Sequence, residues 1–251
     1  MIVREQPDGF IMIEQDHHAR VSGDMIRQWN TFHLPNSPFQ SSLFLAIDQH
    51  DGGWKAYDQD PFWNDYHQVP YSFTDFPNPA KTLLYTNGIE NVEAHDSYAA
   101  LLCSFHYTRF LLDDNQLESR QFVSQERLRQ QRIIRQLPEF RFDIFMKHYG
   151  LLQLCDNLSL FLCINEPGKN EHPFFKNGIP IPDTLDCFHG KSLEITWKDN
   201  HTLRVNDFPF QKDTSFGYSY KWVTKREITT NGLIRAYKQS SFKQISFSIV
   251  S

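Results

Sequence analysis

The order of apolar and polar positions divides the chain into three parts. Residues 1–15 alternate on both sides of a Pro-Asp-Gly turn at 7–9, which is typical of a β-hairpin. Residues 16–164 carry apolar side chains at helical spacing. Residues 165–251 alternate again and are rich in residues that favour strands. The pattern predicts an α+β fold, in which an all-α helical bundle is joined to an N-terminal β-hairpin that packs on a C-terminal antiparallel β-sheet.

The helical part separates into six predicted segments. Asp16 can cap the first one, and the others cover 43–51, 80–93, 97–112, 119–137 and 142 to about 162. Residues 55–79 lie between the second and third segments and carry four prolines and seven aromatic residues. A stretch of this length without periodicity is usually a lid or a segment that wraps around the domain.

Two pairs of strands are expected in the last third of the chain. Residues 193–197 and 202–205 alternate across a polar turn, which predicts a hairpin. Residues 218–228 and 233–250 also alternate and predict two longer strands of the same sheet.

A histidine and an aspartate close the second helical segment. His50 and Asp51 share one helical stripe with Leu43, Ile47 and Trp54, so both polar side chains face the core. Burying an ionised carboxylate without a partner is strongly unfavourable. A cation bound by both residues would compensate for this cost. A hydrogen bond between the two side chains that caps the helix would do so as well, and the pattern leaves both interpretations open.

Three further polar residues interrupt the apolar stripes of other predicted helices. They are His18 in the first segment, His106 in the fourth and Asp156 in the last. His17 lies one residue off the apolar stripe of its helix, so we favour His18. Imidazole and carboxylate groups suit borderline and hard divalent cations, and helix bundles build metal sites from side chains on facing helices. The sequence therefore predicts a metal site where these stripes converge.

Composition excludes several classes of protein. The net charge of -5 and the pI near 6.1 give no general attraction to nucleic acid or to an anionic membrane. The arginines of the fifth segment are expected to be solvated; they are Arg127, Arg129, Arg132 and Arg135. No secretory signal or membrane-spanning run is readable, and the four cysteines lack CxxC spacing, so we expect a cytoplasmic protein with reduced, buried thiols. The expected partner is a small-molecule substrate, and a homo-oligomer stays open.

The order His, His-Asp, His, Asp resembles the HD-domain superfamily of metal-dependent phosphohydrolases. His18 matches the first histidine of that signature, His50 and Asp51 the adjacent pair, and Asp156 the final aspartate. His106 matches an extra histidine that some branches use for a second metal or for phosphate. More specifically, the segments 15–19, 46–54, 101–106 and 154–160 look like an uncharacterised bacterial family, domain of unknown function 3891, over nearly the whole chain.

One departure from the two-metal branches of the superfamily concerns a further histidine. Those branches carry it between the His-Asp pair and the position of His106. Here the candidates are His67, in the proline-rich stretch, and His95, just before the helix that holds His106. Neither lies on a clear apolar stripe, so the sequence does not indicate a complete second metal site.

The resemblance implies a hydrolase that acts on a phosphate ester of a small, nucleotide-like or sugar-like molecule. His18, His50, Asp51 and Asp156 would hold a divalent ion of Mn, Mg, Fe or Zn. Asp51 would also act catalytically by orienting the attacking water. His106 would act on the substrate or share a second metal with His95.

Residues close to the His50-Asp51 pair in the sequence are the candidates for the wall of the implied pocket and for contacts with an anionic substrate. Trp54 and Asp58, at the start of the aromatic stretch that runs to Phe76, would wall the pocket. Lys55 and Lys81 are the nearest cations in sequence, although surface positions suit both of them.

Two other functions are considered as alternatives to the phosphohydrolase. The first is an HD-type di-iron oxygenase, which uses a similar scaffold to oxidise C–H bonds. The second is a catalytically degenerate module that binds a metal or a ligand. A core in which the histidines and aspartates only hydrogen-bond one another is the structural alternative to any metal site.

Overall fold

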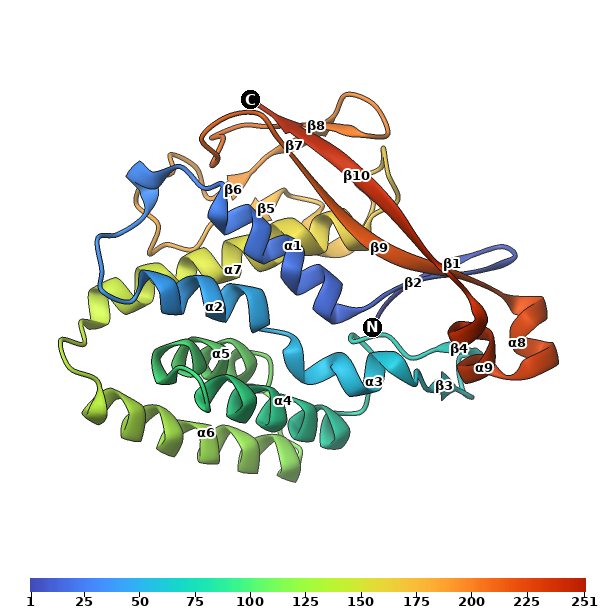
Figure 1. Ribbon diagram of the computed structural model, residues 1–251, viewed down its shortest axis with the longest axis horizontal. Coiled ribbons are helices and arrows are strands. Elements are labelled where there is room, and N and C mark those ends of the chain that lie inside the picture. The colour runs from blue at the N-terminus through green and yellow to red at the C-terminus, as the bar shows by residue number, and fades with distance from the viewer.

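Long helices form one side of the molecule, and a curled sheet crosses over them (Figure 1). The computed structural model describes residues 1–251. The helices are α1 (Gln15–Arg27), α2 (Gln40–Gln49), α3 (Lys55–Gln59), α4 (Asn78–Glu93), α5 (Ser97–Arg109), α6 (Leu117–Gln136), α7 (Phe142–Ile164), α8 (Lys225–Asn231) and α9 (Leu233–Gln239). This mixture of helices and sheet confirms the α+β class.

The main sheet has six strands in the order β1-β2-β9-β10-β8-β7. Their bounds are β1 (Ile2–Gln6), β2 (Gly9–Ile13), β7 (Ile195–Trp197), β8 (Thr202–Val205), β9 (Thr214–Thr224) and β10 (Phe242–Val250). The N-terminal hairpin joins the sheet through β2, which pairs with β9 and sets Phe10 opposite Val223. The expectation of a purely antiparallel sheet was wrong, because β8 runs parallel to β10. Alternation reports which face a side chain takes and carries no information on strand direction.

The predicted strands at 218–228 and 233–250 were correct only in part. Helices α8 and α9 occupy the region between β9 and β10 (Figure 1). A capping box starts α8: the Thr224 side chain accepts a hydrogen bond from the Glu227 N–H, while the Glu227 side chain accepts one from the Thr224 N–H. Gly232, with a φ of 77°, separates the two helices. This local capping chemistry overrides an alternation that continued by chance into residues 225–239.

The helical side is built around α1, α5 and α7. Helix α1 packs against α2 and α7, while α5 contacts α2, α4, α6 and α7. The predicted cap at Asp16 was wrong, because Glu14 holds the N-cap position and Asp16 lies in the first turn. There the Asp16 carboxylate pairs with Arg20 and with Lys55. The helix therefore begins two residues earlier than a cap at Asp16 would allow.

The proline-rich stretch 55–79 wraps around the N-terminal part of the molecule. It contains α3 and a two-stranded hairpin of β3 (Trp63–Asn64) and β4 (Val69–Pro70). Its aromatic rings pack together, with the centres of Tyr57 and Phe76 4.3 Å apart and Phe76 also against Trp54. This packing of its own aromatic residues holds the stretch in place beside α2.

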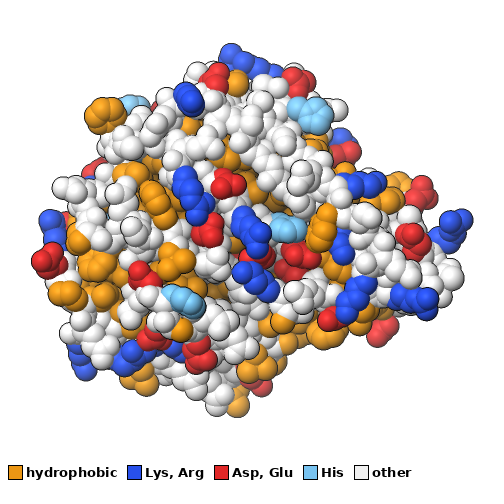
Figure 2. Space-filling view, viewed as in Figure 1, with side chains coloured by type: hydrophobic (Ala, Val, Ile, Leu, Met, Phe, Trp, Pro, Cys, Tyr) orange, Lys and Arg blue, Asp and Glu red, His pale blue; other side chains and the backbone are white.

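One continuous core of 58 buried residues extends from the helices into the sheet. Cys103, Cys155 and Cys163 are buried free thiols, as expected, and no disulfide joins the cysteines. The expected solvated arginine face was wrong for Arg129, which is half-buried and pairs with Glu90, Glu93 and Glu126. On the face seen in Figure 2, positive and negative side chains are interspersed. None of the helices combines the length and apolar character that a membrane crossing requires.

Candidate metal centre

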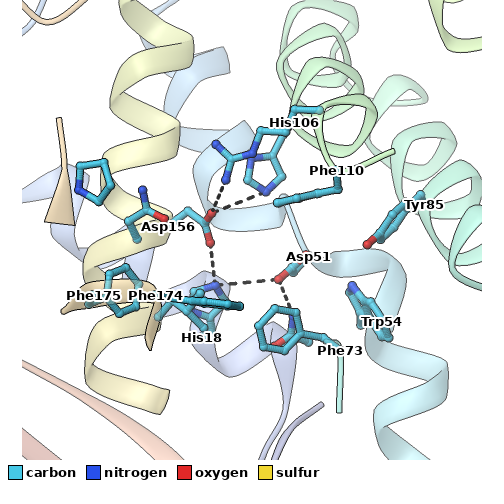
Figure 3. Close-up of a pocket in the computed structure, with 15 residues that line it drawn as sticks. His18, Asp51, Trp54, Phe73, Tyr85, His106, Phe110, Asp156, Phe174 and Phe175 are labelled. Atoms are coloured by element: carbon cyan, nitrogen blue, oxygen red, sulfur yellow. Dashed lines mark hydrogen bonds and ion pairs between the residues drawn. The ribbon is translucent and has the colours of Figure 1, made fainter. Parts of the chain in front are cut away.

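Five buried histidine and aspartate side chains from four helices meet at one point inside the helical part. His18 comes from α1, His106 from α5 and Asp156 from α7, while His50 and Asp51 follow the last residue of α2. None of the five residues is more than 6% exposed. Figure 3 shows His18, Asp51, His106 and Asp156 pointing toward one another. The inward orientation that the helical stripes predicted is present in all five.

The donor atoms of four of these residues form a compact group. The Nε2 atom of His18 lies 3.0 Å from Oδ1 of Asp156 and 3.8 Å from Oδ2 of Asp51. The Nε2 atom of His50 lies 3.4 Å and 3.8 Å from the same two oxygens. The fifth residue, His106, faces the other oxygen of Asp156, with an Nε2–Oδ2 distance of 3.8 Å. Asp156 therefore links the four-residue group to His106.

The end of α2 determines which nitrogen of His50 faces this group. The helix stops at Gln49, so the carbonyl of Ile47 is free to accept a hydrogen bond from Nδ1 of His50 at 2.7 Å. A carbonyl only accepts, so Nδ1 carries a proton, and Nε2 is the nitrogen that faces the group. This Nε2 atom is buried and has no hydrogen-bond partner. A lone pair that faces two carboxylates needs a cation or a proton between them.

Neighbouring polar side chains orient His18 and Asp51. The Oγ atom of Ser159 lies 2.8 Å from Nδ1 of His18, and Ser159 also contacts Ser22 at 2.6 Å. The amide of Gln15 donates a hydrogen bond of 2.9 Å to Oδ2 of Asp51. Outer contacts of this kind hold metal-binding side chains in position and select the histidine nitrogen that faces the metal.

Burial and charge move the pKa values of this cluster in different directions. Burial disfavours the charged form of His50, but the carboxylates of Asp51 and Asp156 outweigh it and raise the pKa from 6.5 to about 9. Burial raises the pKa of Asp51. Burial also tends to raise the pKa of Asp156, but the hydrogen bond from His18 and the nearby imidazole of His50 outweigh it and hold that pKa well below its usual range. Asp156 is therefore more readily ionised than Asp51.

The spacing of the donor atoms suits one divalent cation. Metal–ligand bonds of about 2.1 Å at angles of about 90–110° separate neighbouring donors by about 3.0–3.4 Å. In the four-residue group, Oδ1 of Asp156 lies within this range of the Nε2 atoms of His18 and His50, at 3.0 and 3.4 Å, whereas Oδ2 of Asp51 lies slightly beyond it, at 3.8 Å from both. The group also supplies the mixture of imidazole and carboxylate ligands that such ions bind. These buried side chains could therefore hold a metal ion.

A cavity of about 200 Å³ opens beside the four-residue group. Six aromatic residues belong to its wall, and Figure 3 shows their rings around the metal-binding side chains; they are Trp54, Phe73, Tyr85, Phe110, Phe174 and Phe175. Trp54, which was expected in the pocket wall, is among these lining residues. Gln15, Arg109 and Asn157 add polar groups to the same cavity.

Several residues singled out from the sequence lie elsewhere. Asp58 was expected in the pocket wall, but its buried carboxylate pairs with the amine of Met1 at 2.6 Å and accepts a hydrogen bond from the Gln15 N–H. His95 is exposed at the end of α4 and uses Nδ1 to contact the Asn91 carbonyl, so it does not join His106. His67 is also exposed. Both histidines lie off any apolar stripe, which is why the fold leaves them in solvent.

The two lysines proposed as neighbours of an anionic ligand do not line the cavity either. Lys55 is exposed and pairs with Asp16 at 3.0 Å between Nζ and Oδ1. Lys81 is half-buried, and burial lowers its pKa. The exposed Lys55 thus takes the surface position that also suited it in the sequence, because the turn after Asp51 directs its side chain away from the cavity.

The sequence analysis did not place the arginine or four of the aromatic residues at the cavity; these four are Tyr85, Phe110, Phe174 and Phe175. Arg109 follows His106 by three residues on α5, so its helical position could have placed it on the same side. Phe174 and Phe175 belong to a short 3₁₀ turn, Pro173–Phe175, in the connection after α7. Nothing in the local pattern of that connection indicated that it folds back over the helices.

The fold and the site together define an α+β protein whose helices enclose a candidate metal centre next to a small aromatic cavity. A family model described as Protein of unknown function (DUF3891) matches residues 1–225, and the chain belongs to this family. All residues of the centre and of the cavity lie inside the matched range. No curated protein and no solved structure matches the chain. The family membership predicted from the sequence is confirmed, while the wider resemblance to the HD-domain superfamily stays a prediction.

Proposed function

We propose that the protein is a metal-dependent hydrolase of HD type that acts on a phosphate ester of a small molecule. One observation carries this proposal. Buried imidazole and carboxylate groups from four helices converge, at the spacing of metal ligands, on the wall of a cavity that also contains an arginine. The order of these residues along the chain is the order of the HD signature.

His18, His50, Asp51 and Asp156 would hold the ion. A bound divalent cation supplies a water of lowered pKa and polarises a phosphoryl oxygen. Asp51 is suited to orient the attacking water, because its carboxylate lines the cavity and Gln15 holds it in place. His106 lines the cavity beside Asp156 and can contact a phosphate oxygen. The aromatic walls exclude bulk water from the reacting groups.

The di-iron oxygenase is the second candidate, and the donor atoms give it less support. Two overlapping groups could hold metal: His18, His50 and Asp51 form the first, and His50, His106 and Asp156 form the second. Both groups use His50, and its Nδ1 is already occupied by the Ile47 carbonyl. One Nε2 atom serves one ion, and the exposed His67 and His95 supply no further ligand. Two irons per chain in elemental analysis would reverse this order of candidates.

The test combines metal content with a screen for hydrolysis. The wild-type protein and Asp51→Asn are analysed for bound metal and then incubated with generic phosphate esters in Mn, Mg, Fe or Zn. Asp48→Asn is the matched control, since its half-buried carboxylate lies three residues earlier, in α2, and pairs with Arg27 outside the site. We expect metal-dependent phosphate release from the wild type and the control, and its loss in Asp51→Asn. A wild-type protein that binds metal but hydrolyses no ester would favour the degenerate binding module.

A further inference from the structure

The size and charge of the cavity beside the candidate metal centre restrict its ligand. We propose that this cavity binds a small molecule that consists of an aromatic ring and one phosphate group. Arg109 is the residue that contacts the phosphate. This inference rests on the hydrolase function proposed above and narrows its substrate class. It assigns the site to a small aromatic phosphate monoester in place of a nucleoside diphosphate or triphosphate.

The charges around the cavity match a single phosphate group. Asp51 and Asp156 supply two negative charges, and Arg109 is the only lysine or arginine in the lining. The net charge of these three side chains is about -1, and one bound divalent cation changes it to about +1. A phosphate monoester carries roughly -1.5 to -2 near neutral pH, so it would be nearly balanced. A triphosphate would leave several negative charges without a partner, and burying unpaired charge is strongly unfavourable.

Arg109 is placed to meet a phosphate. It extends from the last turn of α5 on the same side as His106, and its side chain is 25% exposed at the cavity. The guanidinium carbon lies 4.6 Å from the centre of the Phe110 ring, and stacking of this kind holds the planar group in a fixed orientation. Its ion pair with Asp156 is long, at 3.4 Å. The guanidinium therefore retains donors for a bidentate contact with phosphate oxygens.

The aromatic residues define the rest of the ligand. Trp54 and Tyr85 are buried residues of the wall, whereas Phe110 and Phe174 also line the cavity but are 50% and 52% exposed to solvent. A ligand with an aromatic body would cover these two rings and remove their apolar surface from water. The volume of about 200 Å³ lies below the roughly 300–1,000 Å³ of pockets that hold drug-sized ligands. The cavity thus suits one ring and one phosphate.

The experiment measures binding separately from turnover. Phenylphosphonate, inorganic phosphate and α,β-methylene-ADP are titrated calorimetrically into the protein with and without Mn²⁺. The phosphonate and methylene bonds resist hydrolysis, so the heats report binding alone. We expect the Mn²⁺-loaded protein to bind phenylphosphonate at least about tenfold more tightly than either of the other two probes.

Two pairs of variants test the proposed contacts. Arg109→Gln should weaken phenylphosphonate and phosphate alike by about ten- to a hundredfold, and Arg109→Lys should recover part of the loss. The exposed Arg141→Gln is its control. Phe174→Ala should weaken phenylphosphonate several-fold and leave phosphate unchanged. Phe32→Ala, at a residue 94% exposed and outside the cavity, should change neither.

The outcomes separate this inference from the proposed function. Tight, Arg109-dependent binding of phenylphosphonate without hydrolysis of any ester would remove the hydrolase and keep the ligand class. Hydrolysis of esters by a protein that prefers α,β-methylene-ADP, or that is indifferent to Arg109→Gln and Phe174→Ala, would overturn the ligand class and keep the hydrolase. A protein that binds none of the three probes, with or without Mn²⁺, also overturns it.

Discussion

His50 lies at the first position beyond α2, where the helix no longer uses the Ile47 carbonyl. That carbonyl orients the imidazole and leaves its second nitrogen facing two carboxylates. His18 receives the same kind of support from Ser159, a residue three positions after Asp156 on α7. At the scale of single residues, the centre therefore depends on side chains that touch its histidines as well as on the metal-binding residues themselves.

Replacing Ser159 by alanine tests this dependence. Without the hydroxyl the His18 ring loses the partner of its Nδ1 atom, so we expect the affinity for Mn²⁺ to fall by about ten- to a hundredfold. Ser119→Ala is the matched control, because Ser119 is equally buried but donates to Asp114 away from the centre. Calorimetric titration with Mn²⁺ measures both. Equal affinities in the two variants would show that Ser159 does not position His18.

The residues of the centre were predictable because helical spacing alone determines which side of a helix a side chain takes. His18 was separated from His17 in this way, and the structure places His17 against the Ser219 carbonyl, outside the cavity. Asp58 was misplaced because its partner, the Met1 amine, comes from the far end of the hairpin. Arg109 was missed because an arginine in the last turn of a helix usually lies in solvent.

At the scale of elements, a close approach of two glycines holds the loop after α2 against α4. An added Cβ on Gly53 would collide with the carbonyl of Leu84 and lie 3.2 Å from the Cα of Gly88. The turn that contains Gly53 is a 3₁₀ helix, Gly52–Trp54, directly after Asp51. The contact therefore helps to place both Asp51 and Trp54 at the cavity.

Gly53→Ala should destabilise the protein by about 1–3 kcal/mol, because two backbones would have to separate. Gly52→Ala is the matched control: an added Cβ there meets only the Gln49 Oε1 atom at 3.5 Å, an ordinary contact. The free energy of unfolding is measured by urea denaturation of both variants. A Gly53→Ala protein as stable as the control would mean that the approach of the two elements is looser than described.

A buried histidine on α7 should make stability depend on pH. Burial lowers the pKa of His148 from 6.5 to about 4, and its Nδ1 atom accepts a hydrogen bond of 2.8 Å from Tyr98 on α5. Between about pH 6.5 and pH 4, His148 therefore binds a proton in the unfolded chain but not in the folded protein. The resulting stability is complete above pH 6.5 and is lost as the pH falls toward 4, by up to about 3 kcal/mol.

His148→Asn removes this titration and keeps an acceptor near Tyr98. Urea denaturation at pH 7 and pH 5 should therefore show a smaller loss of stability in the variant than in the wild type. His95→Asn, at an exposed position, should behave like the wild type. If His148→Asn and the wild type lose the same stability between these pH values, His148 is not the residue responsible.

At the scale of the whole molecule, the helical part was predictable to within a few residues at each end, while the sheet was predictable only in outline. Helix α7 begins at Phe142 as expected, because a long apolar stripe has no competing interpretation. The parallel pairing of β8 with β10 and the helices α8 and α9 were not predicted. These features depend on how distant segments meet and on one capping box, neither of which is encoded in the alternation of side chains.

The connection after α7 shows that the same limit applies to predicting the site from the sequence. Phe174 and Phe175 line the cavity although they belong to the part of the chain expected to form only sheet. The helical part thus supplies the metal-binding groups, and the connection closes the aromatic wall beside them. Neither part forms the complete site alone.

The most direct test of the central claim is anomalous diffraction from crystals of the protein grown with Mn²⁺. We predict one strong anomalous peak per chain, within about 2.0–2.3 Å of the Nε2 atoms of His18 and His50 and of a carboxylate oxygen from both Asp51 and Asp156. A peak at another position, or crystals that bind Mn²⁺ nowhere while these side chains only hydrogen-bond one another, would contradict the account.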